Sequence, residues 1–262
     1  MTQQSYSTKI VSLHMEDCKH ACPHRSVCYH LKKDIVRDGS VLPNNFRQKI
    51  LDRGYTIHES VCHEITPFHR DLLTLYPNYH VTLPYELFTN DLSIRYETQI
   101  QVTVYNARAA ADKALKGIQK LFLIKDENTW TESLPLWMHP FDSIHFVVDQ
   151  DWLTRERLGT IVLKRMSATG NNITVDSCLE SHLINGSCPY VNGRYIDITF
   201  DRTVRTCPFN PRGIKIEKGM DYNDLFNLRQ EPYCKYKELF SGDADGTRTN
   251  TCLQGDSSDN ED

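Results

Sequence analysis

The sequence predicts an α/β protein with a parallel sheet, followed by a small C-terminal subdomain that contains a β-hairpin. Short runs rich in β-branched and aromatic residues alternate with longer amphipathic stretches, and this alternation stops near residue 178. Such alternation is typical of parallel sheets with right-handed crossovers. Because six strand–helix units are expected, we predict an open sheet or a partial barrel rather than a complete eightfold barrel.

The strands are expected where Val, Ile, Thr and Tyr are concentrated, because these residues suit a pleated, half-buried surface. These segments are residues 9–14, 55–61, 79–83, 99–104, 143–148 and 172–178. Amphipathic stretches between them predict helices over residues 43–51, 68–75, 107–121 and 152–166. The clearest is 107–121, since its apolar residues recur with helical spacing at 111, 114, 115, 118 and 121.

The last part of the chain differs in composition and in its pattern of apolar residues. Residues 179–240 contain YIDITF (195–200), which alternates with period two and lies among Gly, Asn and Pro, so a hairpin subdomain is expected there. Residues 241–262 are acidic and almost without large apolar residues. We predict that they form a disordered acidic tail in which Cys252 is a free thiol.

Composition excludes several classes of protein. The 262 residues are 39% hydrophobic and 24% charged, which rules out wholesale disorder. The formal net charge of −4 argues against a nucleic-acid partner. No apolar run approaches the roughly 20 residues of a membrane span, so no membrane partner is expected. The N-terminus lacks the apolar region of a secretory signal, and a cytoplasmic location is therefore expected.

Three of the nine cysteines stand close together, directly after the first expected strand, as Cys18-x3-Cys22-x5-Cys28. Three thiolates on one loop can hold three irons of a [4Fe–4S] cluster and leave the fourth iron open to a small-molecule ligand. A zinc site remains an alternative, because interleaved histidines offer a Cys3His set, although no standard finger spacing is met. These histidines are His14, His20, His24 and His30.

The order strand, three-cysteine loop, helix, strand resembles the opening of radical S-adenosylmethionine (radical SAM) enzymes. That family usually has Cys-x3-Cys-x2-Cys; this chain keeps the first step, but Arg25 stands at the usual third position and Cys28 follows later. The family's Gly-Gly-Glu-Pro stretch after the second strand is similar to residues 62–67. There Glu64 is kept, Cys62 and His63 replace the glycines, and the proline is displaced to position 67.

The C-terminal region resembles the auxiliary-cluster extension of some radical SAM enzymes, called SPASM or, in shorter form, twitch. That extension opens with a cysteine and continues with a hairpin ending in Gly-x4-Cys. Cys188 and the hairpin up to Cys207 are similar, with Arg202 where the glycine is expected. Cys234 would be a later ligand, and Cys178 would complete the set.

The resemblance implies a partial (β/α)6 barrel over residues 1–178, an auxiliary-cluster subdomain over 179–240 and the tail over 241–262. It implies an enzyme that cleaves S-adenosylmethionine (SAM) reductively to a 5′-deoxyadenosyl radical, which abstracts hydrogen from a peptide or small-molecule substrate. An electron donor such as a flavodoxin or ferredoxin would be required.

The same resemblance assigns the residues of the site. Glu64 and His63 would contact SAM, with Thr103 and Asn106 near its ribose. The [4Fe–4S] cluster would be held by Cys18, Cys22 and Cys28. A second, auxiliary iron–sulfur cluster would be held by Cys178, Cys188, Cys207 and Cys234.

Two other functions are compatible with the residues. The first is a zinc-stabilised module that binds nucleic acid or protein, for which the Cys/His-rich loop carries Lys19, Arg25, Lys32 and Lys33. The second is a metal-dependent hydrolase, although the His-Glu-x2-His spacing of zinc proteases is absent. Its ligands would come from His58, His63, Glu64 and His69.

Overall fold

The strands of the protein form one sheet with the order β10-β9-β8-β1-β2-β3-β4-β5-β6-β7. The strand bounds are β1 Ile10–His14, β2 Thr56–Ser60, β3 Tyr79–Pro84, β4 Ile100–Val104, β5 Gln119–Ile124, β6 Ile144–Val148, β7 Ile173–Val175, β8 Tyr195–Thr199, β9 Thr203–Arg205 and β10 Ile214–Lys215. The computed structural model describes residues 9–14, 45–139, 142–168, 172–176, 178–180, 190, 195–199, 202–208, 210, 212–217, 224–225, 230 and 233.

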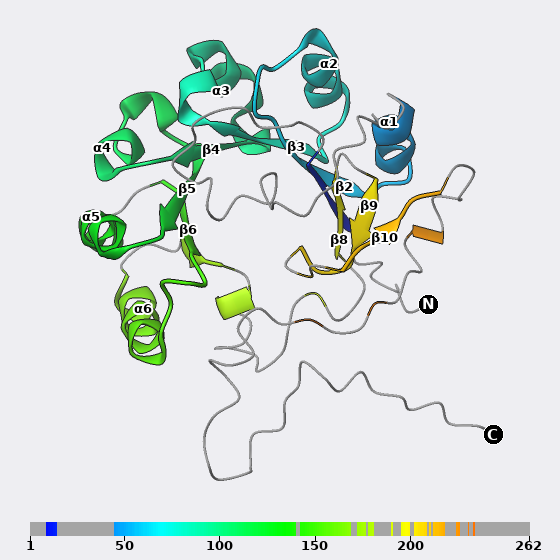
Figure 1. Ribbon diagram of the computed structural model, residues 1–262. Coiled ribbons are helices and arrows are strands. Elements are labelled where there is room, and N and C mark those ends of the chain that lie inside the picture. Colours follow the sequence, from blue (N-terminus) through cyan, green and yellow to red (C-terminus); the bar gives the residue numbers. More distant parts are fainter. Residues whose placement is uncertain are drawn as a thin grey trace, which may run out of the picture.

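The helices lie on one side of this sheet. They are α1 Asn45–Leu51, α2 Pro67–Leu75, α3 Asn90–Tyr96, α4 Ala107–Ala110, α5 Glu127–Met138 and α6 Arg155–Ser167, with short 3₁₀ turns at Tyr85–Leu87, Glu97–Gln99 and Lys113–Leu115. Figure 1 shows the strands β2 to β6 in an arc, with α1 to α6 around its outside. No helix in the described part of the chain is long and apolar enough to cross a membrane.

Strands β1 to β7 are all parallel, each hydrogen-bonded to the next. Strand β8 is also parallel to β1. At the edge of the sheet, β9 is antiparallel to β8, and β10 is antiparallel to β9. The predicted α/β class and parallel sheet are therefore confirmed, and the arc of strands is consistent with a partial barrel.

The core lies between the strands and the helices. Register places Val102, Phe122 and Phe146 side by side or one row apart on the helix-covered face, and each is at most 1% exposed. Trp137 of α5 stacks on Phe146 with ring centroids 4.0 Å apart. Burial of such large side chains is the main force that fixes the helices on this face. We call the opposite face of the strands the inner face.

The helix predicted over residues 107–121 is wrong. The chain instead forms the four-residue helix α4, a 3₁₀ turn and then β5. Asp112 stops the helix, because its side chain accepts a hydrogen bond from the Ala114 N–H and caps the 3₁₀ turn. Gly117 has φ +80°, a left-handed conformation that favours glycine and ends the turn before the strand.

Strand β5 was missed because its apolar residues run consecutively. Phe122, Leu123 and Ile124 are all at most 5% exposed. A strand buried on both faces lacks the alternation by which a sequence indicates a strand. The described part of the chain therefore has seven parallel strands from β1 to β7, one more than predicted.

Helices α3 and α5 were also missed, and two predicted elements have different bounds. Helix α5 begins with a capping box between Asp126 and Thr129, but Pro135 in its last turns obscures the helical pattern. Helix α6 begins after its N-cap Thr154, later than predicted. Strand β7 ends at Val175, so Cys178 lies beyond the strand that was expected to contain it.

The predicted hairpin is confirmed as β8 and β9, which pair antiparallel. The turn between them contains Arg202 with φ 59°, in the left-handed region that favours glycine. This is the position at which the resemblance leads us to expect glycine. The hairpin extends the main sheet, because β8 pairs with β1. The predicted domain boundaries at residues 178 and 240 stay predictions, and residues 241–262 lie outside the described residues.

Replacing Arg202 by glycine is expected to raise the free energy of unfolding by about 0.5–1 kcal/mol. The left-handed conformation costs an L-residue about 1–2 kcal/mol, and glycine avoids this cost. Glycine also loses more backbone entropy on folding, which offsets part of the gain. The change also removes the buried Arg202 Nε, which has no hydrogen-bond partner among the described residues. Urea unfolding measures the effect. Arg212→Gly, at a position without positive φ, serves as the control and should not stabilise the protein.

Candidate functional site

The inner face of the sheet is polar, which is unusual for a parallel sheet. Strands covered on both faces are normally apolar throughout. Here the register brings polar side chains into rows across neighbouring strands. These residues are Ser12, His58, Ser60, His80, Thr82, Gln101, Thr103, Gln119, His145 and Thr174. We therefore identify the inner face as the candidate functional surface, in keeping with the rule that ligands bind near the carboxyl ends of parallel strands.

Two stacked histidines lie on this face. The rings of His58 and His80 are 4.8 Å apart and nearly parallel. Burial, with the neighbouring His80, lowers the pKa of His58 to about 4, and burial also lowers the pKa of His80. His145, which contacts the Thr174 hydroxyl at 2.7 Å, has its pKa lowered by burial as well. All three imidazoles are therefore neutral at pH 7.

The pKa of His58 predicts a pH dependence of stability. Between about pH 6.5 and pH 4 the unfolded chain protonates His58 and the folded chain does not, so the free energy of unfolding falls as the pH is lowered. The expected loss is up to about 3 kcal/mol. Urea unfolding of wild type and His58→Gln across this range measures the effect. The stability of wild type should fall more steeply; parallel profiles would contradict the expectation.

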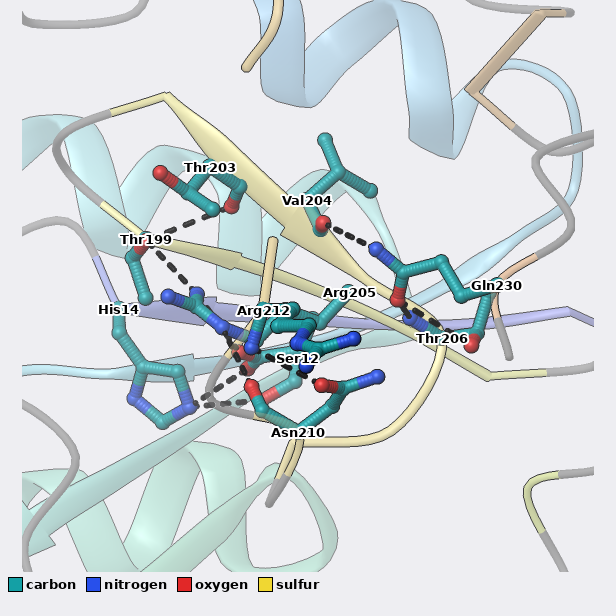
Figure 2. A network of polar contacts seen from close by, with 11 residues as sticks. Ser12, His14, Thr199, Thr203, Val204, Arg205, Thr206, Asn210, Arg212 and Gln230 are labelled. Atoms are coloured by element: carbon teal, nitrogen blue, oxygen red, sulfur yellow. Dashed lines mark hydrogen bonds and ion pairs between the residues drawn. The ribbon is translucent and has the colours of Figure 1, made fainter. Parts of the chain in front are cut away.

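A second polar group lies where β1, β8 and β9 meet (Figure 2). The His14 Nε2 atom is 3.0 Å from an oxygen of Asp197 and 3.1 Å from the Ser12 hydroxyl. Asp197 is fully buried, and its other oxygen is 3.9 Å from the Arg205 guanidinium. Arg205 also donates to the Thr199 hydroxyl at 3.2 Å. These contacts gather at the carboxyl end of β1, although neither Asp197 oxygen has a hydrogen-bond partner among the described residues.

The phenol of Tyr195 is influenced both by this group and by two predicted ligands of the auxiliary cluster, Cys178 and Cys207. Burial is the largest cause that raises the pKa of the Tyr195 phenol, and Asp197, Cys207 and Cys178 raise it further. The Tyr195 phenol also has a hydrogen bond with the Ser12 side chain, which lowers the pKa. Cys178 and Cys207 are both buried. Two cysteines about thirty residues apart in sequence are therefore within electrostatic range of the same phenol.

The predicted SAM contacts lie near the carboxyl ends of two strands. Glu64 and His63 are exposed, just beyond β2. Thr103 is half-buried on the inner face near the end of β4. Asn106 is exposed beyond β4, and its side-chain oxygen accepts a hydrogen bond from the Ala109 N–H at 2.8 Å, which caps α4. The oxygen of Asn106 is thus already engaged by the backbone.

Five predicted metal ligands lie outside the described residues, and for them the prediction stays untested. They are Cys18, Cys22, Cys28, Cys188 and Cys234. The zinc-binding alternative depends on the same cysteines and is therefore also untested. Among the residues that the structure does describe, no group of three or more His, Cys, Asp or Glu side chains could hold a metal ion.

The ligand set proposed for the hydrolase alternative is not brought together. Its four proposed ligands are all described, and they do not form a metal-binding group. His58 stacks on His80 at the inner face. His69 belongs to α2 on the helix side, where it lies 3.9 Å from Glu59, the residue next to His58 on β2. Because adjacent strand residues point to opposite faces, His58 and His69 are separated by the sheet.

A buried polar group on the helix side was not predicted from the sequence. Glu59 is 1% exposed and accepts hydrogen bonds from Arg47 Nε at 2.7 Å and from the Tyr79 hydroxyl at 2.7 Å. A second bond joins Arg47 Nη2 to the other Glu59 oxygen. The signal was present in β2, where Glu59 occupies a core-facing position between Ile57 and Val61. This group joins α1, β2 and β3.

No family model matches the sequence, and no curated protein matches it significantly. Solved structures of SuiB from Streptococcus suis are similar in fold. The complex with the precursor peptide SuiA has a TM-score of 0.50 and 12% identity, covering 79% of this chain and 62% of that chain. The complex with S-adenosylmethionine has a TM-score of 0.47, 10% identity and coverages of 79% and 63%. This chain thus spans about six tenths of the length of SuiB, and at these identities the similarity shows the fold alone.

Proposed function

We propose that this protein is a radical SAM enzyme, which cleaves SAM reductively and abstracts hydrogen from a substrate. The observation that carries the proposal is the adjacency of β1 and β2, which pair in parallel. The cysteine loop follows β1, and Cys62-His63-Glu64 follows β2. Parallel neighbours end at the same edge of a sheet, so the two motifs begin side by side. The fold similarity to SuiB supports the same function.

In this proposal Cys18, Cys22 and Cys28 hold the [4Fe–4S] cluster through three thiolates. When bound, the cluster supplies the electron that splits SAM into methionine and a 5′-deoxyadenosyl radical. The exposed Glu64 carboxylate accepts hydrogen bonds from the amino group of SAM, and His63 lies beside it. The Thr103 hydroxyl contacts the ribose. Asn106 donates to the ribose through its side-chain N–H groups, because its side-chain oxygen already caps α4.

The chain's own residues also position the cofactor loop. Ser12, His14 and Asp197 fix the carboxyl end of β1. The pair of Glu59 and Arg47 fixes α1, which follows the loop, against β2. The described elements on either side of residues 15–44 are therefore held in place by buried contacts, as a site with defined geometry requires.

An auxiliary cluster at Cys178, Cys188, Cys207 and Cys234 is part of the proposal. Its support is that Cys178 and Cys207 are buried and both affect the Tyr195 phenol. The left-handed Arg202 supports it too, because the hairpin turn has the backbone conformation that the family's glycine would adopt. Four thiolates form a complete ligand set for such a cluster.

The proposed substrate is a peptide, with a small molecule as the alternative. The fold similarity to SuiB in complex with a precursor peptide supports this choice. A flavodoxin or ferredoxin is proposed as the electron donor.

Anaerobic purification followed by iron, sulfide and zinc analysis, a visible spectrum and a SAM-cleavage assay tests the proposal. About eight irons per chain and formation of 5′-deoxyadenosine are expected for two clusters. About four irons with cleavage would keep the catalytic site and refute the auxiliary cluster. A colourless protein that holds zinc after iron reconstitution and does not cleave SAM would overturn the proposal in favour of the zinc-stabilised binding module.

A further inference from the structure

Glu64, the proposed contact of SAM, lies in a segment that is held at both ends. At the start of this segment, the Val61 N–H donates to the Thr82 carbonyl of β3 at 2.9 Å. At its end, Thr66 is the N-cap of α2. Only Ile65 separates Glu64 from Thr66, so the two Cα atoms lie within about 7.6 Å of each other. The group that holds Thr66 therefore restricts where the exposed Glu64 carboxylate lies.

His69 holds Thr66 from the first turn of α2. The Thr66 N–H donates to His69 Nδ1 at 3.2 Å, and the His69 N–H donates to the Thr66 hydroxyl at 3.4 Å. The hydroxyl also contacts Nδ1 at 2.9 Å. This reciprocal pair is a capping box, in which the residue at the position of His69 is usually Glu or Gln. Histidine departs from that pattern, and its ring has a second nitrogen.

The second nitrogen of His69 faces Glu59. Because Nδ1 accepts from a backbone N–H, the neutral imidazole carries its proton on Nε2. Nε2 lies 3.9 Å from a carboxylate oxygen of Glu59, and the His69 side chain is only 7% exposed. Glutamate at position 69 would bring two carboxylates together, and glutamine has no second ring nitrogen to face Glu59. Histidine therefore suits a position that contacts Thr66 and Glu59 at once.

Glu59 is itself fixed by two other elements. It accepts hydrogen bonds from Arg47 Nε of α1 and from the Tyr79 hydroxyl of β3, both at 2.7 Å. The Arg47 guanidinium also lies 5.6 Å from the ring centre of Phe68, which directly precedes His69 in α2. Figure 1 shows α1 and α2 side by side. A line of buried contacts therefore runs from α1, which follows the cysteine loop, through Glu59 to His69.

We propose that His69 is a positioning residue for SAM binding, which acts through Thr66 on the Glu64 carboxylate. The identification of the ligand as SAM rests on the proposed function, whereas the restraint on Thr66 rests on the hydrogen bonds themselves. A carboxylate that accepts from the amino group of SAM must be held in place, because a displacement of about 1 Å weakens such a contact strongly.

Equilibrium dialysis of SAM with the full chain, reconstituted anaerobically with iron and sulfide, tests the proposal. His69→Leu removes both ring nitrogens and is expected to weaken SAM binding about tenfold, which corresponds to about 1.4 kcal/mol. His69→Gln supplies the usual capping-box residue and should bind SAM within about twofold of wild type. Thr66→Ala opens the same capping box from its other residue and should weaken binding about threefold. It serves as the second variant if His69→Leu does not fold.

The matched control is Thr154→Ala. Thr154 is the N-cap of α6, where its hydroxyl accepts from the Arg157 N–H at 3.3 Å, and it has no part in the proposed contacts of SAM. The same substitution removes a helix cap here and should leave SAM binding unchanged. Equal losses in Thr66→Ala and Thr154→Ala would overturn the proposal, because they would reflect lower stability alone.

A double-mutant cycle shows whether His69 acts through Glu64. Glu64→Gln alone should weaken SAM binding, and adding His69→Leu to it should weaken binding no further. A merely structural role would give the same loss in both backgrounds. A further loss of about tenfold in the double variant, or unchanged binding in His69→Leu, would therefore overturn the proposal.

Amide hydrogen exchange measured without SAM separates this inference from the proposed function. The Thr66 amide should exchange about tenfold faster in His69→Leu than in wild type, and at the wild-type rate in His69→Gln. Unchanged exchange in His69→Leu would overturn the inference alone. Failure of wild type to bind SAM would overturn the proposed function, and with it the role of His69 in SAM binding.

Discussion

A chain in which Cys18, Cys22 and Cys28 are all alanine is expected to lose SAM cleavage completely. In the proposed function these thiolates hold the cluster that supplies the electron, and alanine offers no ligand in their place. The expected iron content falls by about four per chain. Anaerobic incubation with SAM and dithionite, with chromatographic detection of 5′-deoxyadenosine, measures the result.

The matched control for this experiment is Cys252→Ala, because Cys252 lies in the predicted acidic tail and is assigned to neither cluster. It should retain both iron and cleavage. Production of 5′-deoxyadenosine by the triple variant at the rate of wild type would overturn the assignment of the cysteine loop. Retention of zinc by wild type and its loss from the triple variant would favour the zinc-stabilised module.

Replacing Glu59 by alanine is expected to lower the free energy of unfolding by about 3–5 kcal/mol. Glu59 is almost fully buried, and its carboxylate pairs with Arg47 and accepts from the Tyr79 hydroxyl. Removing it leaves the guanidinium of Arg47 buried without its carboxylate partner, which is the costly way to break a buried pair. Urea unfolding monitored by circular dichroism measures the loss.

Two further variants separate the loss of the pair from the loss of volume. Glu59→Gln keeps the shape and one acceptor, so its loss should be smaller than that of Glu59→Ala. The double variant Glu59→Leu with Arg47→Met replaces both charges by apolar groups and should recover much of the stability. A loss below about 1 kcal/mol for Glu59→Ala would show that the pair contributes no more than an exposed one.

Most of the parallel sheet could be predicted from the sequence, because its strands have simple local patterns. Strands such as β2 and β4 alternate buried and half-buried residues, and this alternation is visible in the sequence. Strand β5 could not be recognised, since burial on both faces removes the alternation. The preceding Ala- and Lys-rich residues favour a helix locally, and Asp112 and Gly117 override that preference through specific backbone geometry.

The candidate site was predictable in part for a different reason. The position of Glu64 follows from its place after a strand, which local sequence fixes. The stack of His58 on His80 and the group around Asp197 depend on which strands become neighbours. Such pairing is decided by the whole fold, and a single sequence does not reveal it. Glu59 was recognisable as a core-facing carboxylate, but its partner Arg47 was not.

The place of β1 in the sheet has a consequence for how the chain folds. Strand β1 pairs with β2 on one edge and with β8 on the other. The backbone hydrogen bonds on its second edge therefore form only when residues 195–199 pair with residues 10–14. Contacts this distant in sequence slow folding, because a long loop must close before they contribute. During synthesis β1 therefore remains an open edge, able to pair with other chains, until most of the protein has emerged. The C-terminal hairpin thus covers the edge of β1 that β2 leaves open.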